Sequence, residues 1–423
     1  MLSLKYIREN LELVKSKTLK QNININFDEI MNLDISRREL ISKSDDLKSK
    51  KNTFSKSIGI MKKNGENISE VLINMKNNSE EIKNMDDKIK VIDDKITNLL
   101  LYIPNVFHDS VPIGNSENDN ILIREWGTPK DFDFTPKDHI ELGEDLSLFD
   151  FKRATKMSGS GFPLYTGLGA KFERCIIQFM LDLHTEKHGY TELFPPFLTT
   201  RSATQTTGQL PKFEEDMYYI QSDDLFCIST AEVPVTNIHK DEILNENDLP
   251  KKYAAYSACF RREAGSYGKD TRGLLRVHQF NKVEMVKFVH PDTSYDELES
   301  LLENAEKVLQ LLNIPYRIIN LCTGDLSFSA AKCYDIEIWA PGTGKWLEVS
   351  SCSNFESFQS RRGNIKFRRS DTGKLDFVHT LNGSGVATPR LVASIIENNQ
   401  NIDGSVNVPD ILKSYMKIDK ISL

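Results

Sequence analysis

The segment from Phe260 to Glu284 carries side chains of the kinds that bind a nucleoside triphosphate. Two strand-like runs flank a loop that contains Gly265, Gly268 and Gly273. Alternate residues of a strand share a face, so the first run predicts Arg261 and Glu263 on one face, opposite Phe260 and Arg262. The second run is predicted to present on one face Arg276, His278, Phe280, Lys282 and Glu284, and on the other Val277, Val283 and Met285.

These side-chain types match the parts of a nucleotide. Arginine forks bind phosphate, an aromatic ring stacks on a base, and carboxylates accept hydrogen bonds from amines. A salt-bridged surface hairpin is the alternative interpretation. The aromatic ring and the glycine-bearing loop favour the interpretation of this segment as a nucleotide-binding hairpin.

Composition limits what kind of protein this is. The chain has 423 residues, enough for two or three domains, and a net charge of −7, so any nucleic-acid surface must be local. Its six cysteines are scattered without a C-x-x-C pair, which indicates reduced thiols in a cytoplasmic protein and neither a disulfide framework nor a zinc site. No signal peptide and no apolar run of membrane-spanning length is present, so no membrane association is expected.

The first hundred residues predict a helical arm. From Phe27 to Leu101 apolar residues recur in heptads, first at Leu33, Leu40, Leu47, Phe54 and Met61, then at Met75, Ile82, Ile89 and Ile96, which interleave with Met85, Ile92 and Leu99. Asn64-Gly65 is turn chemistry, so two antiparallel helices of roughly 50 Å each are expected. Several seam positions are polar, namely Arg37, Ser44, Lys51 and Asn78.

The charge of this arm is uneven. Between Lys43 and Lys63 there are seven lysines and two acidic residues, Asp45 and Asp46. A basic tip is typical of a probe for a phosphate backbone. A solvated surface on a dimerisation coil is the alternative.

The remainder predicts a linker and an α+β body. Ile103-Pro104 ends the second helix, the residues after it form a connector, and a globular domain of about 300 residues follows from Ile121. Strands are expected over 252–260, 274–289 and 334–339, and helices over 167–189 and 295–312. The order lacks βαβ alternation, and neither a G-x-G-x-x-G nor a Walker motif is present, so a mostly antiparallel sheet is predicted.

Two further segments have features that suit a subunit contact and a phosphate or sugar site. A helix ending at Tyr190 leads into the strand Thr191–Phe194, which Pro195-Pro196 breaks, as expected at a sheet edge that could contact a second subunit. Near the C-terminus, the glycine-rich run 381–388 leads to Arg390 at the start of an apolar helix, where backbone amides can hold a phosphate or a sugar.

Together these segments resemble motifs 1, 2 and 3 of the class II aminoacyl-tRNA synthetases, and with the arm the chain resembles the bacterial-type seryl-tRNA synthetase family nearly end to end. The resemblance implies an α+β fold, in which helices flank a class II antiparallel sheet, with an N-terminal antiparallel two-helix coiled-coil arm. It implies a tRNA-binding domain at 1–103, a linker at 104–120 and a catalytic domain at 121–423. The arm has more Asn and Lys and less Arg than is usual in the family.

The resemblance also implies roles for individual residues. Arg261 would bridge the α-phosphate of ATP and the serine carboxylate, Glu263 would hold the adenine amine, Phe280 would stack on the purine, and Arg276 and Arg390 would contact phosphates. The ATP-binding set implied is completed by Arg262, Val277, Glu348, Val349, Ser350 and Ser351. Glu348 and Ser351 would bind Mg²⁺, which prefers oxygen ligands; an ordinary carboxylate at a strand end is the alternative for Glu348.

Serine recognition is assigned by the same resemblance to Thr230, Ala231, Glu232, Arg261, Glu284, Asn382 and Ser384. Thr230 and Glu232 are expected to share a strand face. A small polar site built to bind a hydroxyl rejects alanine, because the groups of the site would be left unpaired. Cys333 and Cys352 are interpreted as packed thiols, and His184, His188 and His379 as structural.

The function implied is that of a cytoplasmic, homodimeric serine–tRNA ligase that uses serine, ATP with Mg²⁺, tRNA(Ser) and tRNA(Sec). The dimer would form through the first motif, and the arm would reach across it to a tRNA through Lys48, Lys50 and Lys51. Two alternatives stay open: a synthetase-like ligase that charges a carrier protein, and a non-catalytic RNA-binding paralogue. Ligases that charge a carrier protein lack the arm, and a non-catalytic paralogue would not need Arg261, Arg276 and Arg390.

Overall fold

The computed structural model describes residues 1–264 and 272–422. Two compact units form. The arm unit comprises Leu2–Leu19 and Ile23–Pro104, and the globular unit comprises Met1, Lys20–Asn22 and the chain from Asn105 onward. Gly265 and Gly268 of the predicted loop lie outside the described residues.

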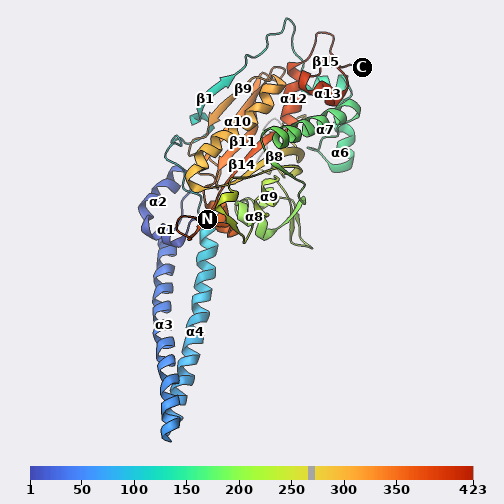
Figure 1. Ribbon diagram of the computed structural model, residues 1–423. Coiled ribbons are helices and arrows are strands. Elements are labelled where there is room, and N and C mark those ends of the chain that lie inside the picture. The colour runs from blue at the N-terminus through green and yellow to red at the C-terminus, as the bar shows by residue number, and fades with distance from the viewer. Residues whose placement is uncertain (265–271, 423) are drawn as a thin grey trace. The chain divides into compact units, whose positions relative to one another are not determined.

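The arm unit consists of helices α1 (Leu4–Glu9), α2 (Leu11–Lys20), α3 (Phe27–Asn64) and α4 (Ser69–Leu100). Helices α3 and α4 run side by side as an antiparallel hairpin, which confirms the predicted arm (Figure 1). Helix α3 ends at Asn64, and the following Gly65 caps it with a φ of +71°, the left-handed conformation that glycine adopts without strain.

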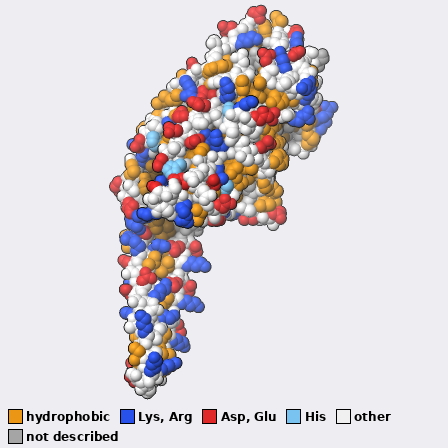
Figure 2. Space-filling model, viewed as in Figure 1, with side chains coloured by type: hydrophobic (Ala, Val, Ile, Leu, Met, Phe, Trp, Pro, Cys, Tyr) orange, Lys and Arg blue, Asp and Glu red, His pale blue; other side chains and the backbone are white. Residues whose placement is uncertain are grey.

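Polar seam residues of the arm are bonded between its two helices. The Ser44 hydroxyl donates to Asp86 Oδ1 at 3.0 Å, and Asn78 Nδ2 donates to the Leu47 carbonyl at 2.9 Å. Polar pairs in a coiled-coil seam fix the register at a cost in stability. Lys and Arg side chains project from the arm on the face that Figure 2 shows.

The globular unit is built on an eight-stranded sheet. Its strand order is β1 (Ile121–Trp126), β9 (Tyr316–Asn320), β10 (Lys332–Ala340), β11 (Lys345–Asn354), β14 (His379–Ala387), β8 (Gln279–Val289), β7 (Lys251–Phe260) and β2 (Thr191–Leu193). Neighbouring strands are antiparallel except for the pair β2 and β7. The mostly antiparallel sheet is therefore confirmed, and Thr191–Leu193 lies at its edge as expected.

Shorter strands form three small sheets. Their members are β13 (Leu375–Phe377), β12 (Lys366–Arg368) and β6 (Ile243–Asn245); β3 (Leu198–Thr200), β5 (Leu225–Cys227) and β4 (Tyr219–Ile220); and β15 (Val406–Asn407) with β16 (Lys420–Ile421).

Helices cover the large sheet. Helices α7 (Gly167–Asp182), α10 (Ser294–Leu312) and α12 (Thr388–Asn398) pack on its strands, as Figure 1 shows. The apolar faces of these helices are buried together with Val283 and Met285 of β8 in one large core. In α10 the helical spacing of Leu298, Leu301 and Leu302 places these three side chains on the buried face. The other helices are α5 (His139–Asp145), α6 (Phe151–Ser158), α8 (Arg201–Thr207), α9 (Glu232–Asn237), α11 (Phe358–Gly363) and α13 (Asp410–Met416).

Four predictions of local structure need correction. Strand β7 ends at Phe260, so Arg261 and Glu263, which were expected on one strand face, lie in the segment that follows the strand. The strand expected over 274–289 begins at Gln279, so Arg276, Val277 and His278 reach their positions from a loop. The helix expected over 167–189 ends at Asp182 and continues as a π-helical turn, Leu183–Lys187. Thr230 precedes the short helix α9 that Glu232 begins, so the two residues do not share a strand face. Among the described residues no helix has both the length and the apolar character that a membrane span needs.

Candidate active site

Strand β8 separates the apolar core from a polar cavity by the alternation of its side chains. Val283 and Met285 face the helices, whereas Lys282 and Glu284 face the opposite way and are nevertheless buried, with exposures of 5% and 0%. Their cross-strand neighbours are small: Ser384 and Ala387 on β14, and Ala255 and Ser257 on β7. Small neighbours leave space above this part of the sheet, where a cavity of about 600 Å³ opens.

One end of the cavity is a cluster of polar side chains around Glu284. Lys282 Nζ lies 2.5 Å from Glu284 Oε2 and donates to Thr230 Oγ1 at 2.9 Å. Asn382 Nδ2 donates to Glu284 Oε1 at 2.8 Å, and the Ser384 hydroxyl donates to Oε2 at 3.5 Å. Residues from β8, β14 and the segment before α9 therefore meet around one carboxylate.

Glu232 forms the buried wall of the same end. Gln359 Nε2 donates to Glu232 Oε1 at 2.6 Å, and Gln359 is itself held by the Thr380 hydroxyl at 2.7 Å. Burial, and then the charge of Glu284, raise the pKa of Glu232 to about 7. Two carboxylates and one lysine thus share a small buried volume near the exposed Arg261, which suits a zwitterionic ligand with a short polar side chain.

Arginines from three segments line the other end of the cavity: Arg261, Arg276 and Arg390. The Arg261 guanidinium lies 5.2 Å from the centre of the Phe280 ring. Arg276 Nη1 is 3.2 Å from Glu263 Oε2, and Glu263 adopts a φ of +51°, an uncommon conformation for a residue with a side chain. Arg390 Nε donates to the Leu275 carbonyl at 3.1 Å, and its Nη1 donates to the Glu348 carbonyl at 2.7 Å.

A bulge in β14 carries the chain from one end of the cavity to the other. The pairing of β14 with β8 shifts register between Ser384 and Ala387, and Val386 between them has a φ of +93°. A positive φ is rare for a β-branched residue and marks local strain. The bulge places Ser384 at the end of the cavity around Glu284 and Arg390, just beyond it, at the arginine end.

Glu348 and Ser351 on β11 offer oxygen atoms to the cavity. The Glu348 side chain is 50% exposed, with Oε2 3.7 Å from Arg390 Nη1. The Ser351 hydroxyl donates to Asp335, whose pKa is raised well above its usual range by burial and by the charge of Glu348. Carboxylate and hydroxyl oxygens fit Mg²⁺, which takes few protein ligands when phosphates supply the others. No cluster of three potential His, Cys, Asp or Glu ligands exists in the described part of the chain.

Most of the predicted site residues line this one cavity. They are Thr230, Glu232, Arg261, Glu263, Arg276, Val277, Phe280, Glu348, Val349, Ser350, Ser351, Asn382, Ser384 and Arg390. Three predicted residues do not line it. Ala231 is fully buried, Glu284 lies beneath Asn382 and Ser384, and Arg262 is exposed, with its backbone N–H bonded to the Asp216 carbonyl.

The predicted tRNA contacts and structural residues lie elsewhere. Lys48, Lys50 and Lys51 are in α3 of the arm unit, where Lys48 pairs with Asp86 at 3.1 Å. Cys333 and Cys352 are buried in β10 and β11, as packed thiols should be.

Several residues of the site were not assigned a role from the sequence. Lys282 was placed on the correct face without a role, and the buried Gln359 and the half-buried Asp335 were not singled out. Further cavity walls come from Gly208, Gln209, Phe213, Asp216 and Met217, and from Ser327, Phe328 and Ser329. A lysine between two acidic or aromatic positions of a strand is the signal that could have identified Lys282; nothing local marks the other residues.

The family comparisons agree with this geometry. A family model described as the tRNA synthetase class II core domain (G, H, P, S and T) matches residues 213–399, the range that holds every residue predicted for the cavity. The sheet and the cavity are therefore those of a class II aminoacyl-tRNA synthetase, an enzyme class. A second model, the seryl-tRNA synthetase N-terminal domain, matches residues 1–107.

Individual relatives narrow the assignment. The chain is 58% identical over 421 residues to the serine–tRNA ligase of Caldicellulosiruptor saccharolyticus, and the match covers 100% of both chains. The seryl-tRNA synthetase of Pyrococcus horikoshii, solved with ATP, superimposes with a TM-score of 0.93 at 38% identity, covering 100% of this chain and 99% of that one. The cytoplasmic serine–tRNA ligase of Naegleria fowleri, solved with AMP, superimposes with a TM-score of 0.89 at 29% identity, with the same coverage of the two chains. The chain belongs to the seryl-tRNA synthetase family, which confirms the resemblance read from its motifs.

Proposed function

We propose that the chain activates serine with ATP and Mg²⁺ to seryl-adenylate and transfers the seryl group to the 3′ end of tRNA(Ser), and also of tRNA(Sec). One observation carries this proposal. Guanidinium groups from three separate segments, Arg261, Arg276 and Arg390, line the same cavity as the polar cluster around Glu284. Two relatives of the fold, solved with ATP and with AMP, support a nucleotide substrate.

The first reaction requires orientation and charge stabilisation more than a side-chain nucleophile. A serine carboxylate oxygen forms a bond to the α-phosphorus, and the bond from this phosphorus to pyrophosphate breaks. Arg261 holds both anions, whereas Arg276 and Arg390 stabilise charge on the leaving pyrophosphate. Glu348 and Ser351 would hold Mg²⁺, which when bound neutralises phosphate charge.

The second reaction transfers the amino acid. A terminal ribose hydroxyl of the tRNA attacks the seryl carbonyl carbon, the bond from this carbon to the phosphate oxygen breaks, and AMP leaves. The adenylate remains in place for this step because Glu263 holds the adenine amine, Phe280 stacks on the purine, and Arg262 and the strand Val349–Ser350 complete the nucleotide site.

The cluster of polar side chains around Glu284 selects serine. Thr230 and Glu232 bind the amine and the hydroxyl, with Asn382 and Ser384 beside them, Glu284 beneath these two and Ala231 behind. Alanine leaves these buried groups without a partner, which is the basis for strong discrimination. Threonine adds only a methyl group and is rejected less strongly.

The proposal includes the assembly. Residues 1–103 form the tRNA-binding domain, 104–120 the linker and 121–423 the catalytic domain. The protein works in the cytoplasm as a homodimer that contacts through the first motif, and Lys48, Lys50 and Lys51 of the arm bind the tRNA across the dimer. The match of the N-terminal family model over residues 1–107 supports a tRNA substrate.

Serine-dependent exchange of pyrophosphate into ATP tests the first reaction. We expect exchange with serine, weaker exchange with threonine, and background with alanine and cysteine. Background exchange with all four amino acids would favour a non-catalytic RNA-binding protein. Exchange with serine but no charging of deacylated tRNA would favour a ligase that acts on a carrier protein.

A further inference from the structure

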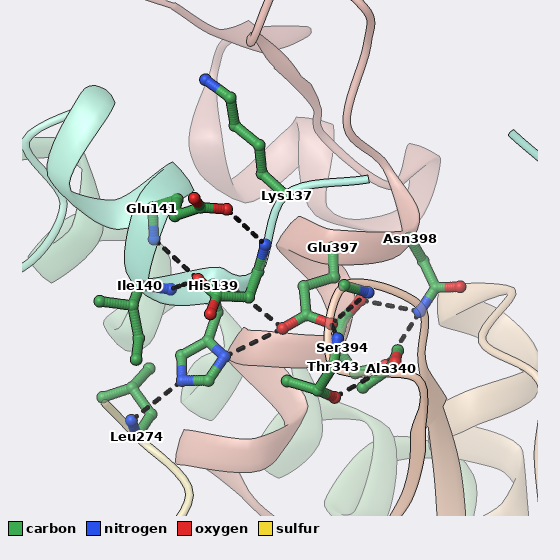
Figure 3. A network of polar contacts seen from close by, with 12 residues as sticks. Lys137, His139, Ile140, Glu141, Leu274, Ala340, Thr343, Ser394, Glu397 and Asn398 are labelled. Carbon is green, nitrogen blue, oxygen red and sulfur yellow. Dashed lines mark hydrogen bonds and ion pairs between the residues drawn. The ribbon is translucent and has the colours of Figure 1, made fainter. Parts of the chain in front are cut away.

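A buried histidine–glutamate pair lies behind the arginine end of the cavity. His139 begins helix α5 and Glu397 is near the end of α12; their exposures are 1% and 0%. Glu397 Oε1 accepts hydrogen bonds from the His139 backbone N–H and from its Nδ1, both at 2.9 Å (Figure 3). Neither residue lines the cavity, and the reaction proposed above uses neither.

The His139 imidazole also contacts the cavity wall, through Leu274. The Leu274 backbone N–H donates to His139 Nε2 at 3.2 Å. Because this N–H can only donate, Nε2 must be unprotonated, and the ring proton is on Nδ1 and points at Glu397. The ring is therefore neutral in this arrangement and connects a carboxylate on α12 to the backbone of a cavity-lining residue.

Gly273 shows how closely the chain approaches this ring. Its φ is +66°, and a Cβ at this position would lie 2.3 Å from His139 Nε2 and 2.7 Å from Ile140 Cγ1. Both the conformation and the close approach require glycine. The backbone before Leu274 is thus in contact with the ring.

Helix α12 holds the segment 274–276 at two points. Glu397 does so through His139 and Leu274, and Arg390, on the same helix, does so directly through the Leu275 carbonyl at 3.1 Å. The next residue is Arg276. The other oxygen of Glu397, Oε2, accepts from the backbone N–H groups of Gly342 at 2.9 Å and Thr343 at 3.3 Å, in the turn between β10 and β11.

We propose that His139 and Glu397 are positioning residues of the ATP site: they fix the backbone of Leu274–Arg276 against α12, so that Arg276 and Arg390 keep their separation around the triphosphate. Without this support the nucleotide binds with its phosphates misplaced. A misplacement of about 1 Å by a residue far from the chemistry can lower a rate about 100-fold. The proposal rests on the proposed ATP site.

Two substitutions at His139 separate the hydrogen bonds. In His139→Asn the side-chain amide is near the place of Nδ1 and can donate to Glu397, but nothing reaches Leu274. In His139→Gln the side-chain oxygen reaches the place of Nε2 and can accept from the Leu274 N–H. In serine-dependent exchange, we expect His139→Asn to lower kcat/KM for ATP about 10- to 100-fold and to leave the KM for serine within 2-fold of the wild-type value. The kcat/KM for ATP of His139→Gln should be at least about 3-fold higher than that of His139→Asn.

The matched control is His379→Asn. His379 is a mostly buried histidine whose Nδ1 bonds Ser294 Oγ at 2.9 Å, and it does not line the cavity. We expect this control to lower the Tm without changing the KM for ATP. Unchanged ATP parameters in a folded His139→Asn enzyme, or equal losses in His139→Asn and His139→Gln, would overturn the proposal.

If His139→Asn does not fold, Glu397→Asp serves in its place, since a shorter carboxylate retreats from His139 but keeps its charge. Folded Glu397→Asp enzyme with unaltered kcat/KM for ATP would contradict the positioning role. Wild-type exchange tests the proposed ATP site separately, because its absence would refute that site, whereas only the differences among variants test the pair.

Discussion

Lys282 and Glu284 form a buried ion pair on one face of β8, with 2.5 Å between Nζ and Oε2. The same ammonium group donates to Thr230, and the same carboxylate accepts from Asn382. Lys282 thus sets the charge and the shape of the proposed serine pocket, although it was not among the residues that the family resemblance assigned to serine.

Replacing Lys282 by Met should raise the KM for serine about 10- to 100-fold and leave the KM for ATP within 3-fold, because Glu284 and Thr230 lose the group that orients them. Breaking a buried pair also costs about 3–5 kcal/mol of stability. Steady-state exchange kinetics and denaturant unfolding measure the two effects.

Lys287 on the same strand gives the matched control. It is equally buried and binds Glu297 Oε2 at 2.8 Å, but it faces the helices instead of the cavity. Lys287→Met should lose stability with little change in the KM for serine. Similar rises in the KM for serine in both variants would mean that Lys282 acts only through stability.

Glu348→Gln should lower exchange about 100-fold at millimolar Mg²⁺ and shift the activity to higher Mg²⁺, because an amide oxygen is a weaker ligand than a carboxylate. A titration of the initial rate against free Mg²⁺ measures the shift. Glu337 is the cross-strand neighbour of Glu348, pairs with Arg317 and does not line the cavity. Glu337→Gln should therefore retain the Mg²⁺ dependence of the wild type, and an equal shift in both variants would argue against a metal site at Glu348.

Stability should fall as pH rises through the titration of Glu173. This buried carboxyl accepts from Asn281 and Thr388, its Oε2 has no partner among the described residues, and burial raises its pKa from 4.5 to about 7. Between these two values the folded chain retains a proton that the unfolded chain has lost, so raising the pH favours unfolding.

Glu173→Gln removes this penalty. Since one pKa unit corresponds to about 1.4 kcal/mol, the stability of the variant relative to wild type should rise by up to about 3 kcal/mol between pH 4.5 and pH 8. Urea unfolding at a series of pH values measures it. Glu192→Gln, at an exposed carboxyl on β2, should show no such trend, and parallel curves for Glu173→Gln and wild type would contradict the prediction.

Replacing Lys48, Lys50 and Lys51 together by Gln should raise the KM for tRNA and reduce the slope of log affinity against log salt by up to about 3, because each lost phosphate contact removes about 0.9 from the slope on a duplex. Lys48 already pairs with Asp86, so it should contribute least. Aminoacylation at several salt concentrations measures both effects, and exchange without tRNA should remain unchanged. An unaltered salt slope would show that these lysines do not contact the tRNA.

The sequence predicted the parts of the site whose chemistry is local. Heptad spacing predicted α3 and α4, strand alternation predicted the faces of Lys282 and Val283, and the motif residues Arg261, Arg276 and Arg390 do line one cavity. The parts that failed depend on tertiary packing. Residues 274–278 have strand-like side chains, yet Leu274 is bound by His139 and Leu275 by Arg390, so this backbone leaves the sheet.

The supporting residues were not predictable for a related reason. His139 and Glu397 are 258 residues apart, and Gln359 and Glu232 are 127 apart, so nothing in their immediate neighbourhoods relates them. Such pairs become visible only when the sheet order places their elements together.

The order of strands also determines when this protein can begin to work. Strand β8 lies between β7, which precedes it in the chain, and β14, whose Asn382 bonds Glu284 although the two residues are 98 positions apart. A nascent polypeptide that has emerged only as far as Leu381 holds neither the Asn382 amide nor Arg390. Ligase activity therefore requires synthesis to continue beyond Arg390, and proteolytic removal of the chain from Asn382 onward would remove polar groups from both ends of the cavity at once.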